Sequence, residues 1–181
     1  MTDKFIDWDE VDQWHADLTG LWPCGDGINP PPEGWPNISK SAVIGERPYH
    51  HAGDAGEGVP VLLNREVSIG ALTVVAAGHK RNTVIGRSYI GSQVHVGHDT
   101  VIGDGCDIHA GTIIGGFVTI EDDVKIGIGA KIRPHRKIGK GSYIGMGSVV
   151  TKDVPPGEVW FGSPAGFGRG PDNRHFGHLS G

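Results

Sequence analysis

The chain has 181 residues, a mass of 19.2 kDa and a formal net charge of −5 at pH 7. Its 37% hydrophobic and 20% charged residues exclude a wholly disordered chain, and its acidity argues against a surface that tracks nucleic-acid phosphates. It lacks an 18-residue apolar run, an apolar N-terminal leader and a disulfide framework, so we expect a cytoplasmic protein without a membrane span.

The first 37 residues differ in composition from the rest of the chain. Apolar side chains recur at helical spacing over residues 4–22, namely Phe5, Trp8, Val11, Trp14, Leu18 and Leu21. Residues 23–37 (PCGDGINPPPEGWPN) are rich in proline and glycine and predict a linker. We therefore expect an amphipathic helix and a linker within residues 1–37.

From residue 90 onward one position recurs every six residues and always holds a β-branched aliphatic side chain: Ile90, Val96, Ile102, Ile108, Ile114, Ile120, Ile126, Ile132, Ile138, Ile144 and Val150. Glycine usually follows it, and the residue two before it is small or β-branched except at Arg136. Residues two apart face the same side of a strand, and glycine permits the sharp turn that ends it. The period therefore predicts stacked coils of short parallel strands with an internal aliphatic ladder.

The hexads extend upstream in two pairs of aliphatic residues: Ile38 and Ile44, then Ile69 and Val75. Residues 46–62 predict a loop insertion, and residues 76–83 predict a shorter bulge. Loops on a rigid scaffold often carry function. We place a β-helix domain over residues 38–161 and a Gly-rich tail over residues 162–181.

The hexad pattern resembles the left-handed parallel β-helix of hexapeptide-repeat acyltransferases. In that family three hexads make one triangular coil of 18 residues. Two ladders should then stack in register: Val96, Ile114, Ile132 and Val150, and Ile90, Ile108, Ile126 and Ile144. We expect an all-β fold, a left-handed parallel β-helix with a short N-terminal helix and a loose C-terminal tail.

The segment SQVHVGHDTVIGDGC, residues 92–106, carries the candidate catalytic residues. Val96 points inward, so His98 lies on the following turn, exposed and next to Asp99. One coil later stands Gly116, whose bare backbone N–H would face whatever His98 contacts. A base beside an unhindered N–H donor is the minimum equipment for acyl transfer.

Two groups of acyltransferases share longer stretches with the chain. Residues 69–132, with IGALTVV, NTVIG and SQVHVGHDTVIGD, resemble the N-acyltransferase of lipid A synthesis, which acylates a UDP-glucosamine derivative. The stretch from Val96 through GSVVTKDVPPGEVWFGSPAG is similar to sialic-acid and bacillosamine acetyltransferases. Both resemblances imply that His98 is the general base, and the second implies that the Gly116 N–H binds the oxyanion.

The donor prediction follows from the same stack. The His98 corner continues to Gly116, Pro134 and Lys152, and a pantetheine arm along this edge would end among four cationic side chains, Arg133, Arg136, Lys137 and Lys152. These charges suit the phosphates of coenzyme A, although they are equally consistent with a solvated surface. The N-terminal segment is too short for the nucleotide-binding domains of the two groups, which favours acetyl-CoA over acyl carrier protein as donor.

The acceptor candidates lie on the two loops. Tyr49, His50, His51, His79 and Lys80 offer aromatic and polar groups that fit a sugar or nucleotide-linked sugar, although ordinary loop polarity explains them equally well. The resemblance also implies a homotrimer with active sites between subunits. We predict an acetyl-CoA-dependent N-acetyltransferase without a metal ion.

Two alternatives use the same scaffold. The γ-type carbonic anhydrases bind zinc through three histidines across a subunit boundary and need two histidines five residues apart. Here His95 and His98 are three apart, and position 90 is Ile90. The other alternative is a β-helix scaffold without catalytic activity, against which the set of His98, Asp99 and Gly116 argues.

Overall fold

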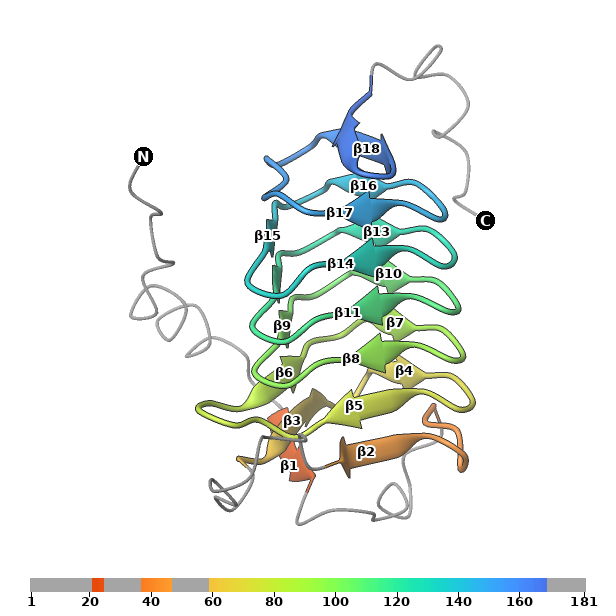
Figure 1. Ribbon diagram of the computed structural model, residues 1–181. Helices are drawn as coiled ribbons and strands as arrows, with labels where there is room; N and C mark the ends of the chain where they lie inside the picture. Colours follow the sequence, from red (N-terminus) through yellow and green to blue (C-terminus); the bar gives the residue numbers. More distant parts are fainter. Residues whose placement is uncertain (1–20, 25–36, 47–58, 169–181) are drawn as a thin grey trace, which may run out of the picture.

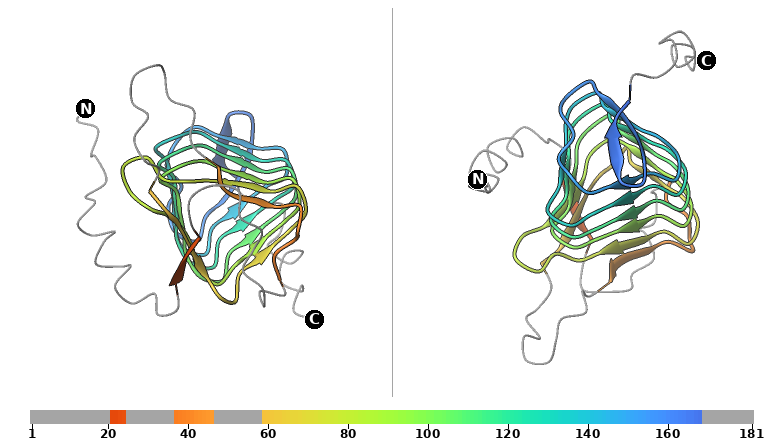
Figure 2. Two further views of the ribbon diagram at one scale, coloured as in Figure 1. Left: turned by 90° about the horizontal axis from the view of Figure 1, so that it is seen from below. Right: turned by 45° about the horizontal axis from the view of Figure 1, so that its top comes forward.

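The computed structural model describes residues 21–24, 37–46 and 59–168, and over these residues the chain winds as a left-handed parallel β-helix (Figure 1). Seen along its axis the coil is a triangle whose three sides are stacked short strands (Figure 2). The predicted fold class is therefore confirmed. No described helix is long and apolar enough to cross a membrane.

The three sides are sheets A, B and C. Sheet A contains β1 (Leu21–Cys24), β3 (Val61–Asn64), β6 (Thr83–Ile85), β9 (Val101–Ile102), β12 (Thr119–Ile120) and β15 (Lys137–Ile138). Sheet B contains β4 (Ser68–Ile69), β7 (Tyr89–Ile90), β10 (Asp107–Ile108), β13 (Lys125–Ile126), β16 (Tyr143–Ile144), β18 (Val159–Gly162) and β19 (Ala165–Phe167). Sheet C contains β2 (Val43–Glu46), β5 (Val74–Ala76), β8 (His95–Val96), β11 (Ile113–Ile114), β14 (Lys131–Ile132) and β17 (Val149–Val150).

Both predicted ladders are in register. Val96 pairs with Ile114, Ile114 with Ile132, and Ile132 with Val150 in sheet C. The ladder from Ile90 to Ile144 runs through sheet B in the same way. Every hexad aliphatic residue of both ladders is at most 3% exposed, and full burial of such a side chain stabilises the fold by about 1.5–3 kcal/mol.

The N-terminal prediction is wrong at residues 21–24. Leu21–Cys24 form strand β1, which pairs antiparallel with β3, so neither the helix nor the linker includes them. The edge of β3 offers unpaired backbone groups, and pairing with them outweighs the local helical spacing. The rest of the predicted helix and linker, residues 4–20 and 25–36, lies outside the described residues.

The C-terminal boundary also needs correction. Val159–Gly162 and Ala165–Phe167 form an antiparallel hairpin, so the predicted loose tail does not begin at residue 162. Trp160 pairs with Ile144 in sheet B and is only 9% exposed, so it continues the buried ladder at the end of the coil. Residues 169–181 lie outside the described residues.

The two loops leave the helix close to the predicted points. The insertion expected at 46–62 is shorter, because β2 ends at Glu46 and β3 begins at Val61, and its residues 47–58 lie outside the described part of the chain. The shorter bulge spans residues 77–82, between β5 and β6. Val59 and Gly78 form an antiparallel bridge, with N–O distances of 2.9 and 2.8 Å, that joins the two loops.

Candidate active site

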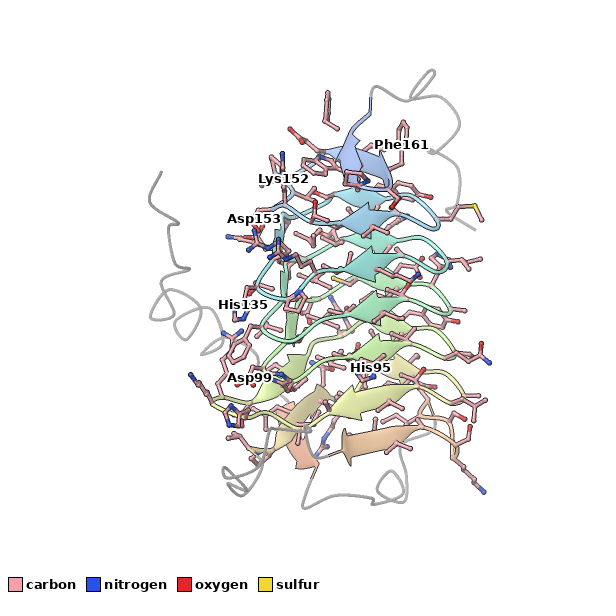
Figure 3. The ribbon with its side chains drawn as sticks, in the orientation of Figure 1. His95, Asp99, His135, Lys152, Asp153 and Phe161 are labelled. Carbon is pink, nitrogen blue, oxygen red and sulfur yellow. The ribbon has the colours of Figure 1, made fainter. Side chains whose placement is uncertain are left out.

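The candidate residues gather on the edge between sheets C and A, which we call the CA edge. It consists of the bulge 77–82 and the corners at 97–100, 115–118, 133–136 and 151–153. Figure 3 shows Asp99, His135, Lys152 and Asp153 one above another along this edge, whereas His95 lies on the front of sheet C. The predicted column of His98, Gly116, Pro134 and Lys152 thus runs along one edge of the triangle.

The third residue of most corners adopts a left-handed backbone conformation, and in the corners at 97–100, 115–118 and 133–136 the CA edge has no glycine at this position. The third residue of its corners has a positive φ and carries a side chain in three successive coils: Asp99 (57°), Phe117 (58°) and His135 (59°). At the other edges this position is glycine in six corners and carries a side chain in three, Leu72 (57°), Gln93 (58°) and Asp123 (59°); the glycines are Gly105, Gly111, Gly129, Gly141, Gly147 and Gly157. A left-handed conformation costs an L-residue roughly 1–2 kcal/mol, and such strain clusters at functional sites.

Asp99 is the most densely bonded residue of the edge. Its side chain is fully buried, and the carboxylate accepts hydrogen bonds from the backbone N–H groups of His79 (2.9 Å), Lys80 (2.7 Å) and Arg81 (2.7 Å). The Arg81 guanidinium donates to the Asp99 carbonyl oxygen through Nε (3.0 Å) and Nη2 (2.6 Å). The Asp99 N–H donates to Thr83 Oγ1 (3.0 Å). Asp99 therefore fixes the bulge to the coil that carries His98.

The imidazole of His98 is oriented by this carboxylate. His98 Nδ1 lies 2.7 Å from Asp99 Oδ2. A carboxylate can only accept, so Nδ1 carries the proton and Nε2 is the unprotonated nitrogen of the neutral ring. The His98 side chain is 27% exposed, which leaves the ring accessible from solvent.

Asp99 stays ionised in spite of its burial. Burial alone would raise the pKa of its carboxyl group, but the hydrogen bonds from His98 and from three backbone N–H groups together hold this pKa below its ordinary value of 3.8. The folded state therefore gains stability from the ionised form above the unfolded pKa. That gain is lost as the pH falls through the lowered folded pKa.

Asp99→Asn is expected to lower the free energy of unfolding at pH 7 by about 1–3 kcal/mol, because the amide turns a donor toward N–H groups that need an acceptor. The difference between wild type and variant should stay constant above about pH 5 and shrink below about pH 4, where Asp99 of the unfolded chain becomes protonated while folded Asp99 is still ionised. Urea unfolding at pH values from 7 to 3 measures it. A difference that grows as the pH falls would contradict the lowered pKa.

The absence of a side chain at Gly116 leaves the space that the His98 ring occupies. A Cβ built on Gly116 would lie 2.7 Å from His98 Nε2 and 2.8 Å from Cε1, so the ring rests against the bare backbone of the next coil. The Gly116 carbonyl oxygen accepts from the His135 N–H (3.0 Å), whereas its N–H makes no backbone hydrogen bond to any residue that the structure describes. The predicted pair of base and N–H donor is thus side by side.

Two aromatic residues of the edge were missed by the sequence analysis. The ring of Phe117 meets that of His98 edge-on, with centroids 5.2 Å apart and an interplanar angle of 87°. His135 stacks on Phe117, with centroids 4.8 Å apart and an angle of 6°. Asp99, Phe117 and His135 are 18 residues apart, so the period could have indicated that they stack one above another.

The four predicted donor-binding cations divide into two pairs. Lys137 Nζ lies 2.7 Å from Glu121 Oε1, and Arg136 Nη1 lies 3.5 Å from Asp153 Oδ1, so both are partly neutralised. Arg133 and Lys152 are exposed, and neither forms an ion pair within the described part of the chain. Arg133 directly precedes Pro134 in one corner, and Lys152 stands one coil beyond Pro134 in the column.

The predicted acceptor residues are only partly described. Tyr49, His50 and His51 lie outside the described residues. His79 is beside His98, with the ring centroids 6.3 Å apart, and Lys80 is exposed on the same bulge. The bulge that Asp99 fixes therefore brings one of the predicted acceptor residues next to His98.

The described part of the chain contains no set of side chains that could bind the zinc ion of the carbonic anhydrase alternative. No three histidine, cysteine, aspartate or glutamate side chains converge there as a metal site requires. His95 is exposed and pairs with Val74 and Ile113 in sheet C, so it points away from the CA edge where His98 lies.

Comparisons with known proteins relate the chain to bacterial acyltransferases. The family model "Bacterial transferase hexapeptide (six repeats)" matches residues 117–152. Residues 117–152 therefore match the hexapeptide repeat of bacterial transferases. This hexapeptide-repeat chain is 38% identical over 135 residues to UDP-3-O-acylglucosamine N-acyltransferase of Methylorubrum populi, a match that covers 71% of the chain and 38% of the relative. The chain thus spans well under half of the length of this relative.

Solved structures agree on the fold. A UDP-N-acetylglucosamine acyltransferase superposes with a TM-score of 0.69 at 29% identity, covering 72% of the hexapeptide-repeat chain and 51% of the other. The polySia-specific acetyltransferase NeuO superposes with a TM-score of 0.54 at 26% identity, covering 59% of each chain. The resemblance to hexapeptide-repeat acyltransferases is therefore upheld.

Proposed function

We propose that the protein is an acyltransferase that moves an acyl group from a thioester to an amino group of a sugar or nucleotide-linked sugar. The observation that carries the proposal is the His98 imidazole, held by Asp99 and lying against the backbone of Gly116. Base, orienting carboxylate and N–H donor are the parts that amide formation from a thioester needs.

In the proposed reaction Nε2 of neutral His98 takes a proton from the acceptor amine as the amine nitrogen attacks the thioester carbonyl. The Gly116 N–H donates to the oxyanion of the tetrahedral intermediate. Asp99, ionised and bonded to Nδ1, stabilises the imidazolium that forms. The intermediate collapses with loss of the thiolate, which receives the proton from His98, so an amide and a free thiol leave the site.

The donor proposal is acetyl-CoA. Its support is a pair of exposed cations on the CA edge: Lys152 in the column of His98, and Arg133 next to Pro134 of that column. Guanidinium and ammonium groups bind phosphates through charge-assisted hydrogen bonds. The similarity to a named acetyltransferase, NeuO, also supports a short acyl group.

The acceptor proposal is an amino sugar, free or linked to a nucleotide. It rests on the relatives, whose names state that they act on UDP-linked glucosamine derivatives, and on the bulge with His79 and Lys80 beside the base. The homotrimer with sites between subunits stays a prediction from the resemblance.

Titration calorimetry with coenzyme A and with acetyl-CoA tests the donor. Lys152→Ala is expected to weaken binding about 10-fold, because an exposed phosphate contact is worth roughly 1–1.5 kcal/mol. Lys125→Ala, an exposed lysine of sheet B, is the matched control and should bind like wild type. Binding of neither compound to the wild type would refute coenzyme A as donor and direct the search to acyl carrier protein.

A further inference from the structure

We infer that Phe117 is a positioning residue that holds the imidazole of His98 in its reactive orientation. The inference rests on the proposed function for its activity readout, and it adds a residue that neither the sequence motif nor the acyl-transfer chemistry requires. Phe117 directly follows Gly116, in a corner of the CA edge.

The first observation is the arrangement of groups around the His98 ring. Asp99 holds Nδ1 on one side, and the backbone of Gly116 lies within van der Waals reach of Nε2 and Cε1. The ring of Phe117 meets the imidazole edge-on at 5.2 Å, a favourable geometry for an aromatic pair. The His98 side chain is 27% exposed, and of the two aromatic rings that meet it edge-on, Phe117 at 5.2 Å is nearer than His79 at 6.3 Å.

The second observation is the support behind Phe117. Its own ring is only half-buried, and His135 of the next coil stacks on it almost parallel, at 4.8 Å and 6°. The backbone is tied as well, since the Phe117 N–H donates to the His98 carbonyl oxygen at 2.9 Å. The two aromatic rings and this hydrogen bond connect three successive coils at the point where His98 stands.

The third observation is the backbone conformation of Phe117. Its φ of 58° lies in the left-handed region, which a bulky residue rarely adopts. Six equivalent corners at the other edges hold glycine and three hold Leu72, Gln93 or Asp123, so the coil closes with or without a side chain at this position. The ring of Phe117 is therefore not needed to close the corner, and what distinguishes this position is its contacts with His98 and His135.

Phe117→Gly separates positioning from stability. Glycine relieves the strained backbone, so this variant should melt about 2–4 °C above Phe117→Ala, which keeps the strain and also lacks the ring. Both variants should lose about 10-fold or more in kcat, with KM for the acyl donor changed less than 3-fold, because a displaced base slows proton transfer rather than donor binding. Phe117→Tyr keeps the ring and should restore kcat to within about 3-fold of wild type.

A second readout needs no activity. The NMR resonances of the His98 ring protons should shift when the Phe117 ring is removed, and the Nδ1 proton should exchange with water about 10-fold faster as the ring gains freedom. Unchanged exchange and unchanged kcat in Phe117→Gly would overturn the inference. If the wild type transfers no acyl group to any amino sugar while the exchange rate still rises in the variant, the proposed function fails and the positioning role stands.

Discussion

His98→Ala is expected to lower kcat by about 100-fold or more, because the acceptor amine then has no base to take its proton. The geometry supports this size of effect, since the Asp99 carboxylate 2.7 Å from Nδ1 makes Nε2 the proton acceptor. Steady-state kinetics with the donor and acceptor pair that the wild type uses gives the measurement.

His95→Ala is the matched control for this variant. His95 lies three residues earlier on the same stretch, is exposed, and points outward from sheet C (Figure 3). It should leave kcat within about 2-fold of wild type, as surface substitutions away from a site usually do. A rate for His98→Ala near that of His95→Ala would remove His98 from the mechanism.

Gly116→Ala is the second substitution with a large expected effect. The added Cβ would lie 2.7 Å from His98 Nε2, so the imidazole must move while the backbone, whose φ is ordinary, accepts alanine. A displacement of about 1 Å at a catalytic group costs on the order of 100-fold in rate. We therefore expect kcat to fall by about 100-fold, with the free energy of unfolding lowered by only about 1–3 kcal/mol, because the clash meets a movable side chain.

Gly166→Ala provides the control for adding a methyl group to a glycine. A Cβ at Gly166 meets no atom within 4 Å, so this variant should keep both its rate and its stability. Circular dichroism melting and kcat, measured on both variants, test the pair. If Gly116→Ala loses stability by much more than 3 kcal/mol, the glycine serves the packing of the coil rather than the site.

Much of the fold could be predicted from the hexad period because the period equals the length of one strand and its corner, so each repeat specifies one strand. An aliphatic side chain every six residues from Ile90 to Val150 specifies which side of each strand faces the core, and the 18-residue coil then fixes the register. The ends did not follow from it. β1 and the β18–β19 hairpin lie beyond the regular repeat, and their pairing partners are distant in sequence or follow an irregular turn.

The sequence predicted which candidate residues stack along the CA edge, but not the contacts that their side chains make with one another. His98, Asp99 and Gly116 were found from one motif and one period. Phe117 and His135 carried the same period, but nothing in the sequence distinguished a functional aromatic side chain from a surface one. Their positive φ and their stacking appear only in three dimensions.

The sequence by itself determined the inward ladders of short strands, because inward and outward positions alternate along each strand. The left-handed coil of 18 residues, and with it the edge on which His98 stands, came from the resemblance to the hexapeptide-repeat family. Only the tertiary structure decided that Asp99 is buried and ionised and that it orients the imidazole of His98. Three consecutive N–H groups of the bulge at 79–81 converge on the Asp99 carboxylate from the coil before it. Such a contact depends on where an irregular loop returns to the helix, which repeat periodicity does not encode.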